Sequence, residues 1–226
     1  MRINLTHINF TMILFAKVYF PRFFKAPSEK SIDAKLSARE TLNWERDKYQ
    51  SLLKLKQHGS RIITSLCELK AITKTQETDS LYACVEGVMQ KAISNRSFNP
   101  ALYSNELNNR FTLLKAKIAE DKKLDKCFSG LNIVTNSIFS TVGFLGVVLF
   151  GMAITTGPLG AALFAVGMTI ASALVATITA YSAYVDARFI GDKQLKEIEA
   201  GINFISNYPN GALLDEVDER NTLFCI

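Results

Sequence analysis

A long uncharged stretch dominates the chain: residues 127–185 contain no acidic or basic side chain and no histidine. The turn-forming sequence Thr155-Thr156-Gly157-Pro158 divides it into two apolar halves, 131–154 and 159–184. Each half is longer than the about 20 residues that span the hydrocarbon core of a bilayer. In hydrocarbon each backbone amide needs an internal partner, so both halves must be helical. The stretch predicts a transmembrane helical hairpin that contacts the lipid bilayer and turns at Gly157 and Pro158.

Small residues predict how the two halves pack against each other. They are Gly143, Gly146 and Gly151 in the first half, and Ala161, Ala165, Thr169, Ala173 and Thr177, spaced by four, in the second. Such residues let helix backbones approach closely in a membrane. We expect the two sets to form the seam of the hairpin, with bulky neighbours facing lipid. The same small-residue faces are also candidates for self-association.

A hairpin buried inside a soluble helical bundle, as in the pore-forming colicins, is the alternative. Such a core needs a shell of amphipathic helices, and the rest of the chain offers few of them. We therefore favour membrane insertion. Asn132 and Asn136 lie one turn apart near the start of the first half. We expect them in the headgroup region, with a polar lining or an interhelical hydrogen bond as the alternative.

Basic residues flank both ends of the hairpin, whereas its turn is uncharged. The flanking bases are Lys115, Lys117, Lys122, Lys123 and Lys126 before it, and Arg188, Lys193 and Lys196 after it. Positively charged flanks tend to remain on the cytosolic side of a membrane. The sequence therefore predicts a membrane protein with two spans and both termini in the cytosol.

The remainder of the chain shows helical periodicity and no strand pattern, so an all-α fold is predicted. The expected segments are a basic aromatic N-terminal segment (1–30), a helical cytosolic domain (31–126), the transmembrane hairpin (127–185) and a helical, acidic C-terminal tail (186–226). We expect the cytosolic domain to fold without the hairpin. Its helices would offer a surface for a protein partner.

Within the cytosolic domain, helices are predicted over 31–58, 60–72 and 79–94, and a fourth from Asn99-Pro100 onward. Gly59 lies where a glycine cap would end the first of these helices. Ser129-Gly130 is expected to kink or break the fourth helix where the apolar stretch begins.

The first 25 residues combine basic and aromatic side chains. The aromatic residues are Phe10, Phe15, Tyr19, Phe20, Phe23 and Phe24. The apolar run among them is short and no cleavage site follows it, so a secretory signal peptide is not expected. Three explanations stay open: a segment lying in a membrane interface, a packed N-terminal element, or a translation start at Met12.

Sequence motifs for catalysis or metal binding are absent. His7 and His58 are the only histidines, and the four cysteines lack the spacing of a zinc or redox site. No phosphate-binding glycine loop or hydrolase motif is present. We therefore expect no enzyme activity, no cofactor and no metal. No basic cluster points to nucleic acid as a partner.

The last twelve residues place an acidic cluster before a short apolar end. The residues that form this pattern are Asp215, Glu216, Asp218, Glu219, Leu223 and Phe224. The pattern resembles the C-terminal translocation signal of Dot/Icm type IV secretion effectors of Legionella-like bacteria. The resemblance covers about a twentieth of the chain. It implies export into a host cell and a host membrane as destination, and it implies no catalytic residue.

These features are consistent with three functions. The first is a membrane-anchored helical interaction or targeting protein, acting as a secreted bacterial effector at a host membrane. The second is a pore-forming or membrane-perturbing protein with an insertable hairpin, and the third is a membrane-tethered enzyme. We favour the first, because the hairpin accounts for anchoring and no catalytic motif supports the third.

Overall fold

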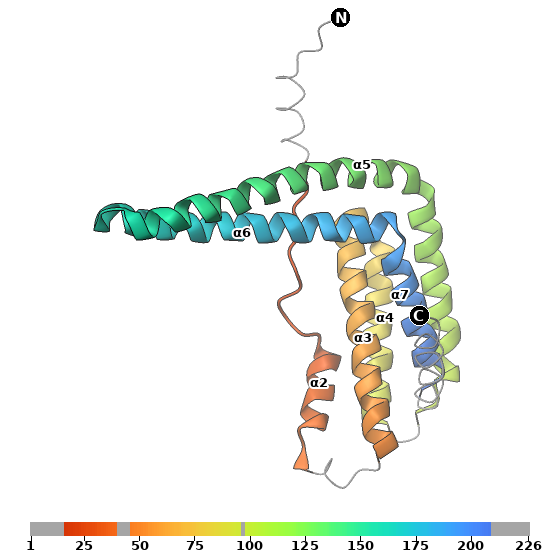
Figure 1. The fold of residues 1–226 in the computed structure, drawn as a ribbon. Helices are drawn as coiled ribbons and strands as arrows, with labels where there is room; N and C mark the ends of the chain where they lie inside the picture. Colours follow the sequence, from red (N-terminus) through yellow and green to blue (C-terminus); the bar gives the residue numbers. More distant parts are fainter. Residues whose placement is uncertain (1–15, 40–45, 96–97, 209–226) are drawn as a thin grey trace, which may run out of the picture. The chain divides into compact units, whose positions relative to one another are not determined.

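The computed structural model of the chain describes residues 16–39, 46–95 and 98–208. These residues form six α-helices and no β-strand, which confirms the predicted all-α fold (Figure 1). The chain divides into two compact units. The hairpin unit comprises residues 1–21 and 123–191, and the bundle unit comprises residues 22–122 and 192–226. Each unit therefore combines segments that are far apart in the sequence.

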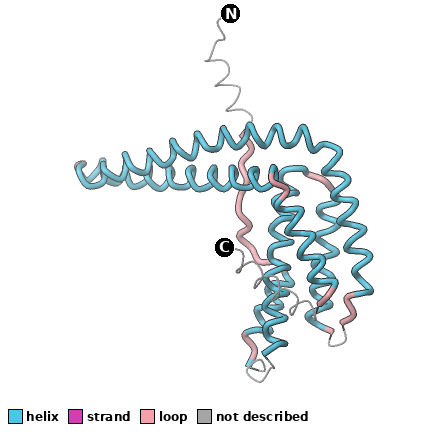
Figure 2. Tube along the Cα trace, turned by 45° about the vertical axis from the view of Figure 1, so that its right-hand side comes forward, coloured by secondary structure: helices cyan, strands magenta, loops and turns pink. Residues whose placement is uncertain are grey.

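Two long apolar helices form most of the hairpin unit and lie side by side (Figures 1 and 2). Helix α5 covers Ala101–Thr156, and its part from Lys123 onward belongs to this unit; α6 covers Leu159–Ile190. Gly157 and Pro158 form the turn between them. Proline suits the position before the first turn of α6, because its missing N–H would have no partner there.

Helix α5 continues through Ser129-Gly130 without interruption, so a break at this point is wrong, and the alternative of a kink stays a prediction. A single glycine inside a helix costs only about 1 kcal/mol relative to alanine. The helical residues on both sides continue the hydrogen-bond ladder across it. The long helical segments on both sides of Ser129-Gly130 therefore outweigh the weak helix propensity of these two residues.

The bundle unit contains α2 (Pro27–Leu36), α3 (Arg46–Thr73), α4 (Gln76–Ser94), the first part of α5 and α7 (Lys193–Ser206). Helix α3 packs against α2, α4 and α7. Its buried side chains recur at helical spacing, as do those of α5. Examples are Leu55, Ile62, Leu66 and Leu69 on α3, and Leu107, Phe111, Leu114 and Ile118 on α5.

Gly59 lies inside α3 and does not end a helix, so the predicted boundary between residues 58 and 60 is wrong. A Cβ atom at this position would clash with the Sδ and Cε atoms of Met89 on α4. Glycine therefore leaves room for the end of the Met89 side chain, which would have to move if this position carried a Cβ atom. Sequence alone does not distinguish this role from a cap, because both place glycine beside helical residues.

Helix α7 belongs to the bundle unit, which differs from the predicted division into a domain of residues 31–126 and a separate tail of residues 186–226. Its Ile198, Ile202 and Ile205 are buried in that unit. The bundle therefore needs a helix from beyond the hairpin to complete its core. Residues 209–226, including the predicted secretion signal, lie outside the described residues.

Candidate membrane hairpin

The seam of the hairpin is formed where small residues let α5 and α6 approach closely. A Cβ atom on Gly143 would lie 2.8 Å from the backbone nitrogen of Ala176 and 2.9 Å from the backbone oxygen of Ser172. One on Gly146 would lie 2.5 Å from the Ser172 Oγ. The Ser140 hydroxyl donates to the carbonyl of Ala176 at 3.2 Å. Backbone contact and a side-chain hydrogen bond thus join the two helices.

The predicted small-residue stripe follows this seam only in part. On α6, Ala165 is buried and Thr169 and Ala173 are half-buried, whereas Ala161 and Thr177 are exposed. Residues spaced by four drift by about 40° per step around a helix of 3.6 residues per turn. A strict spacing of four therefore leaves the interface within a few steps.

On the α5 side, Gly143 and Gly146 face α6, but a Cβ atom on Gly151 would have no neighbour within 4 Å. The contacts on α6 fall on Ser172 and Ala176, which the predicted stripe omitted. Ser172 and Ala176 are spaced by four residues, whereas Gly143 and Gly146 are spaced by three. Alternating spacings of three and four average near 3.5 residues, which keeps a seam facing its partner helix. Counting small residues at alternating spacings of three and four would have found them.

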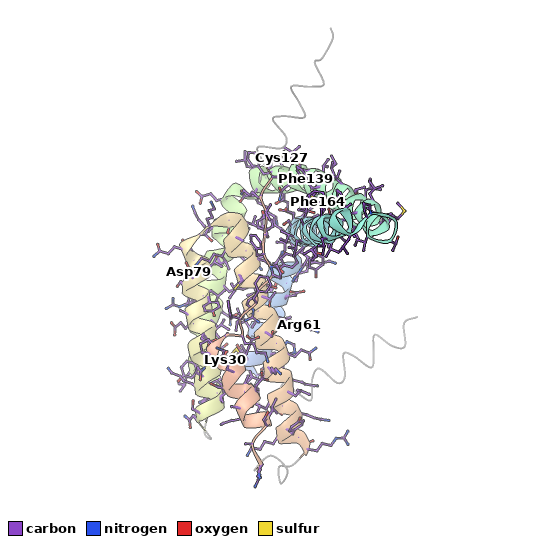
Figure 3. The ribbon with its side chains drawn as sticks, turned by 90° about the vertical axis from the view of Figure 1, so that its left-hand side faces the viewer. Lys30, Arg61, Asp79, Cys127, Phe139 and Phe164 are labelled. Carbon is purple, nitrogen blue, oxygen red and sulfur yellow. The ribbon has the colours of Figure 1, made fainter. Side chains whose placement is uncertain are left out.

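Large apolar side chains cover the outer surface of the hairpin. Exposed examples are Val142, Phe144, Leu145 and Leu149 on α5, and Leu163, Phe164, Ile170 and Leu174 on α6. Figure 3 shows side chains projecting from the hairpin, Phe164 among them. Nearly all side chains in the most apolar part of each helix are unburied. A hairpin buried in a soluble bundle would show the opposite.

Both helices are long and apolar enough to cross a membrane, judged by length and composition. The two candidate spans are Lys122–Thr155 and Leu159–Ile190. A helix of 32 residues is about 48 Å long, which exceeds the about 30 Å thickness of the hydrocarbon core. The hairpin could therefore insert with its base left in the headgroup region.

Four buried polar side chains lie at the base of the hairpin, at the end opposite the turn. We call them the polar clamp: Asn132 and Asn136 from α5, and Ser182 and Asp186 from α6. All four are at most 4% exposed. The Nδ2 of Asn132 donates to Asp186 Oδ2 at 2.5 Å and so joins the two helices directly.

The polar clamp also holds the backbone of an N-terminal segment. Asn132 Oδ1 accepts from the N–H of Lys17 at 2.7 Å, and its Nδ2 donates to the Lys17 carbonyl at 3.0 Å. Ser182 Oγ accepts from the N–H of Tyr19 at 2.8 Å. The Tyr19 hydroxyl lies 3.4 Å from Asp186 Oδ1 and donates to it. Burial, and then the nearby Asp186 carboxylate, raise the pKa of the Tyr19 phenol, so it remains a donor.

These contacts show the interactions of Asn132 and Asn136, and their expected position in the headgroup region stays a prediction. The side chain of Asn132 makes the interhelical hydrogen bond that was the alternative, and Asn136 Nδ2 donates to the Lys17 carbonyl at 3.1 Å. Asn136 Oδ1 is buried without a hydrogen-bond partner among the described residues. No sequence signal links Lys17 to residues more than 110 positions away.

The described residues offer no group of three or more His, Cys, Asp or Glu side chains that could hold a metal ion. Burial raises the pKa of the Cys67 and Cys84 thiols, so both favour the unreactive protonated form. The His58 ring stacks on Phe204 at 4.2 Å between centroids. These side chains serve packing in the bundle unit.

No protein-family model, curated protein or solved structure matches the chain.

Proposed function

We propose that this chain is a membrane-anchored interaction or targeting protein, inserted by the α5–α6 hairpin. The main support is the arrangement of side-chain sizes in the hairpin, which is the reverse of the arrangement in a soluble helical bundle. Small residues close its seam, while large apolar side chains point outward without cover. In water this surface would be costly to expose, whereas in lipid it needs no partner.

The orientation proposed for the hairpin places both of its ends on the cytosolic side. Lys122, Lys123 and Lys126 precede the apolar part of α5, and Arg188 and Lys193 follow that of α6. The turn at Gly157 and Pro158 carries no charge and would reach the opposite side. The bundle unit would then face the cytosol, where its helices are available to a protein partner.

Membrane fractionation with carbonate extraction tests this proposal. We expect the wild-type protein to stay in the membrane pellet. The double variant L149R/L174R should leave it, because each charge at a span centre costs about 2.5–3.5 kcal/mol on the insertion scale. The matched control is L102R/L113R, which changes two leucines of similar exposure on α5 within the bundle unit. Resistance of L149R/L174R to extraction would contradict the proposal.

Dye release from liposomes separates anchoring from the pore-forming alternative. We expect the wild-type protein to insert without releasing the dye. Release that is lost in L149R/L174R and retained in L102R/L113R would replace the anchor proposal with a membrane-perturbing function.

Delivery by type IV secretion is a separate proposal, supported by the resemblance of the C-terminal tail. Deleting residues 215–226 should abolish translocation of a reporter fusion from a bacterium with a Dot/Icm system. Membrane association should persist, because it depends on the hairpin. Unchanged translocation would remove the basis of this proposal and leave the anchor proposal standing.

A further inference from the structure

A short stretch, Lys17–Phe20, is bound to the hairpin through its backbone, and some of its apolar side chains are exposed. The polar clamp binds the backbone of Lys17 and Tyr19, and the Tyr19 side chain is only 6% exposed. The intervening Val18 and the following Phe20 are exposed, the latter at 64%. The stretch is thus held by polar contacts, while two of its apolar groups have no cover among the described residues.

The distance between the polar clamp and the turn sets the depth of this stretch in a bilayer. Asn132 lies 24 residues before the end of α5 at Thr156, and Ser182 lies 23 residues after the start of α6 at Leu159. At 1.5 Å per residue these lengths are about 36 Å and 35 Å. The hydrocarbon core is about 30 Å thick. With the turn at the far interface, the clamp lies at the near headgroup level.

The stretch combines a basic and an aromatic side chain. Lys17 and Phe20 are both exposed and lie three residues apart. Aromatic and basic side chains together favour the boundary between headgroups and acyl chains.

We propose that residues 17–20 are an interfacial anchor that the polar clamp holds against the same bilayer that the hairpin enters. Phe20 enters the boundary between headgroups and acyl chains. The anchor rests on the proposed membrane insertion of the hairpin. It extends that function, because it adds a third membrane contact from a segment outside the apolar stretch.

Tryptophan fluorescence of the full chain in liposomes tests the anchor. The single native tryptophan, Trp44, is first replaced by phenylalanine. Phe20→Trp, Leu149→Trp and Leu102→Trp then report on the anchor, the hairpin and an exposed control position. The vesicles contain phosphatidylcholine and phosphatidylserine, with bromines placed either near the headgroup or deep in the acyl chains.

We expect a blue-shifted emission from Phe20→Trp that shallow bromines quench more than deep ones. Leu149→Trp should show the reverse order of quenching, and Leu102→Trp should show little quenching by either. If Leu149→Trp is quenched by deep bromines while Phe20→Trp behaves like Leu102→Trp, the anchor is overturned and the hairpin proposal stands. Absence of quenching at Leu149→Trp would overturn both.

Variants of the polar clamp test whether it places the anchor. Asn132→Leu removes the two hydrogen bonds that Asn132 makes to Lys17 and its bond to Asp186, and leaves the bond from Asn136 to Lys17. Ser182→Ala removes the bond to the Tyr19 N–H. Either change should reduce the shallow quenching of Phe20→Trp and leave the deep quenching of Leu149→Trp unchanged. Unaltered quenching of Phe20→Trp in both variants would show that the clamp does not hold the anchor. A protein partner on Phe20 would instead protect it equally from both sets of bromines.

Discussion

The bundle unit and the hairpin unit are both helical, but they place large and small side chains in opposite positions. In the bundle unit, side chains such as Leu66 and Met89 are fully buried between helices. In the hairpin unit, Gly143 and Ser172 meet across the seam, and Phe164 points outward. Helix content alone therefore does not indicate whether the surface of a unit suits water or lipid. The position of the large apolar side chains carries that information.

Removing the hairpin tests whether the bundle unit is independent, and it should give the largest effect. Lys122 Nζ and Asp192 Oδ2 are 3.2 Å apart at the two ends of the excised segment. Replacing residues 123–191 with a short Gly-Ser linker should therefore leave a soluble, helical protein that melts cooperatively. A chain of residues 22–122 lacks α7 and should lose cooperative melting by circular dichroism. Cooperative melting of the chain without α7 would contradict the structural role of that helix.

The same truncation in the two units should have different consequences. Leu66→Ala removes a side chain that is 1% exposed and should lower the free energy of unfolding by about 2–5 kcal/mol. Leu163→Ala removes one that is 69% exposed and should change it by less than about 0.5 kcal/mol. Urea titration of the full chain in mild detergent measures both. Equal losses would show that detergent or a packed neighbour covers Leu163 as tightly as the bundle covers Leu66.

Within the seam, two glycines should respond differently to alanine. Gly143→Ala brings a methyl group against the backbone of Ser172 and Ala176, which should destabilise the hairpin by about 1–3 kcal/mol. Gly151→Ala meets no neighbour, so its better helix propensity should stabilise by up to about 1 kcal/mol. Thermal unfolding in detergent compares the two. A loss at Gly151 that matches the loss at Gly143 would mean that the seam extends further than the structure shows.

Acid should weaken the bundle unit through Glu29. Burial raises the pKa of this carboxyl, but hydrogen bonds from Arg22, Ser60 and the Ala26 N–H outweigh burial and hold it below its usual 4.5. The stabilisation is present above pH 4.5 and is lost as pH falls through the lower folded pKa. We expect a loss on the order of 1 kcal/mol, because Arg22 remains partly hydrated.

The variant Glu29→Gln isolates this contribution. Its free energy of unfolding should be lower than that of the wild-type protein at neutral pH and should approach it in acid. Denaturant titrations at several pH values measure the difference. A constant difference across that range would assign the acid sensitivity to other carboxylates.

Much of the fold follows from local patterns in the sequence. The charge-free stretch, its length and the turn at Gly157-Pro158 define the hairpin. Each helix must form its backbone hydrogen bonds internally, and proline interrupts a helix only at its own position in the chain. Helical spacing likewise predicts the buried stripe of Leu107, Phe111 and Leu114. Gly59 shows the limit of such reasoning, since a residue on another helix decides its role.

Local sequence patterns are enough to predict an all-α protein with two helices apolar enough to enter a membrane and with basic flanks. They do not predict that α7 completes the bundle, that Ser172 and Ala176 form the seam, or that the polar clamp holds Lys17 and Tyr19, all of which appear only in the folded chain. The difference arises from the range of the interactions. Helix formation depends on residues three and four positions apart, whereas these contacts join segments whose proximity exists only after the chain has folded.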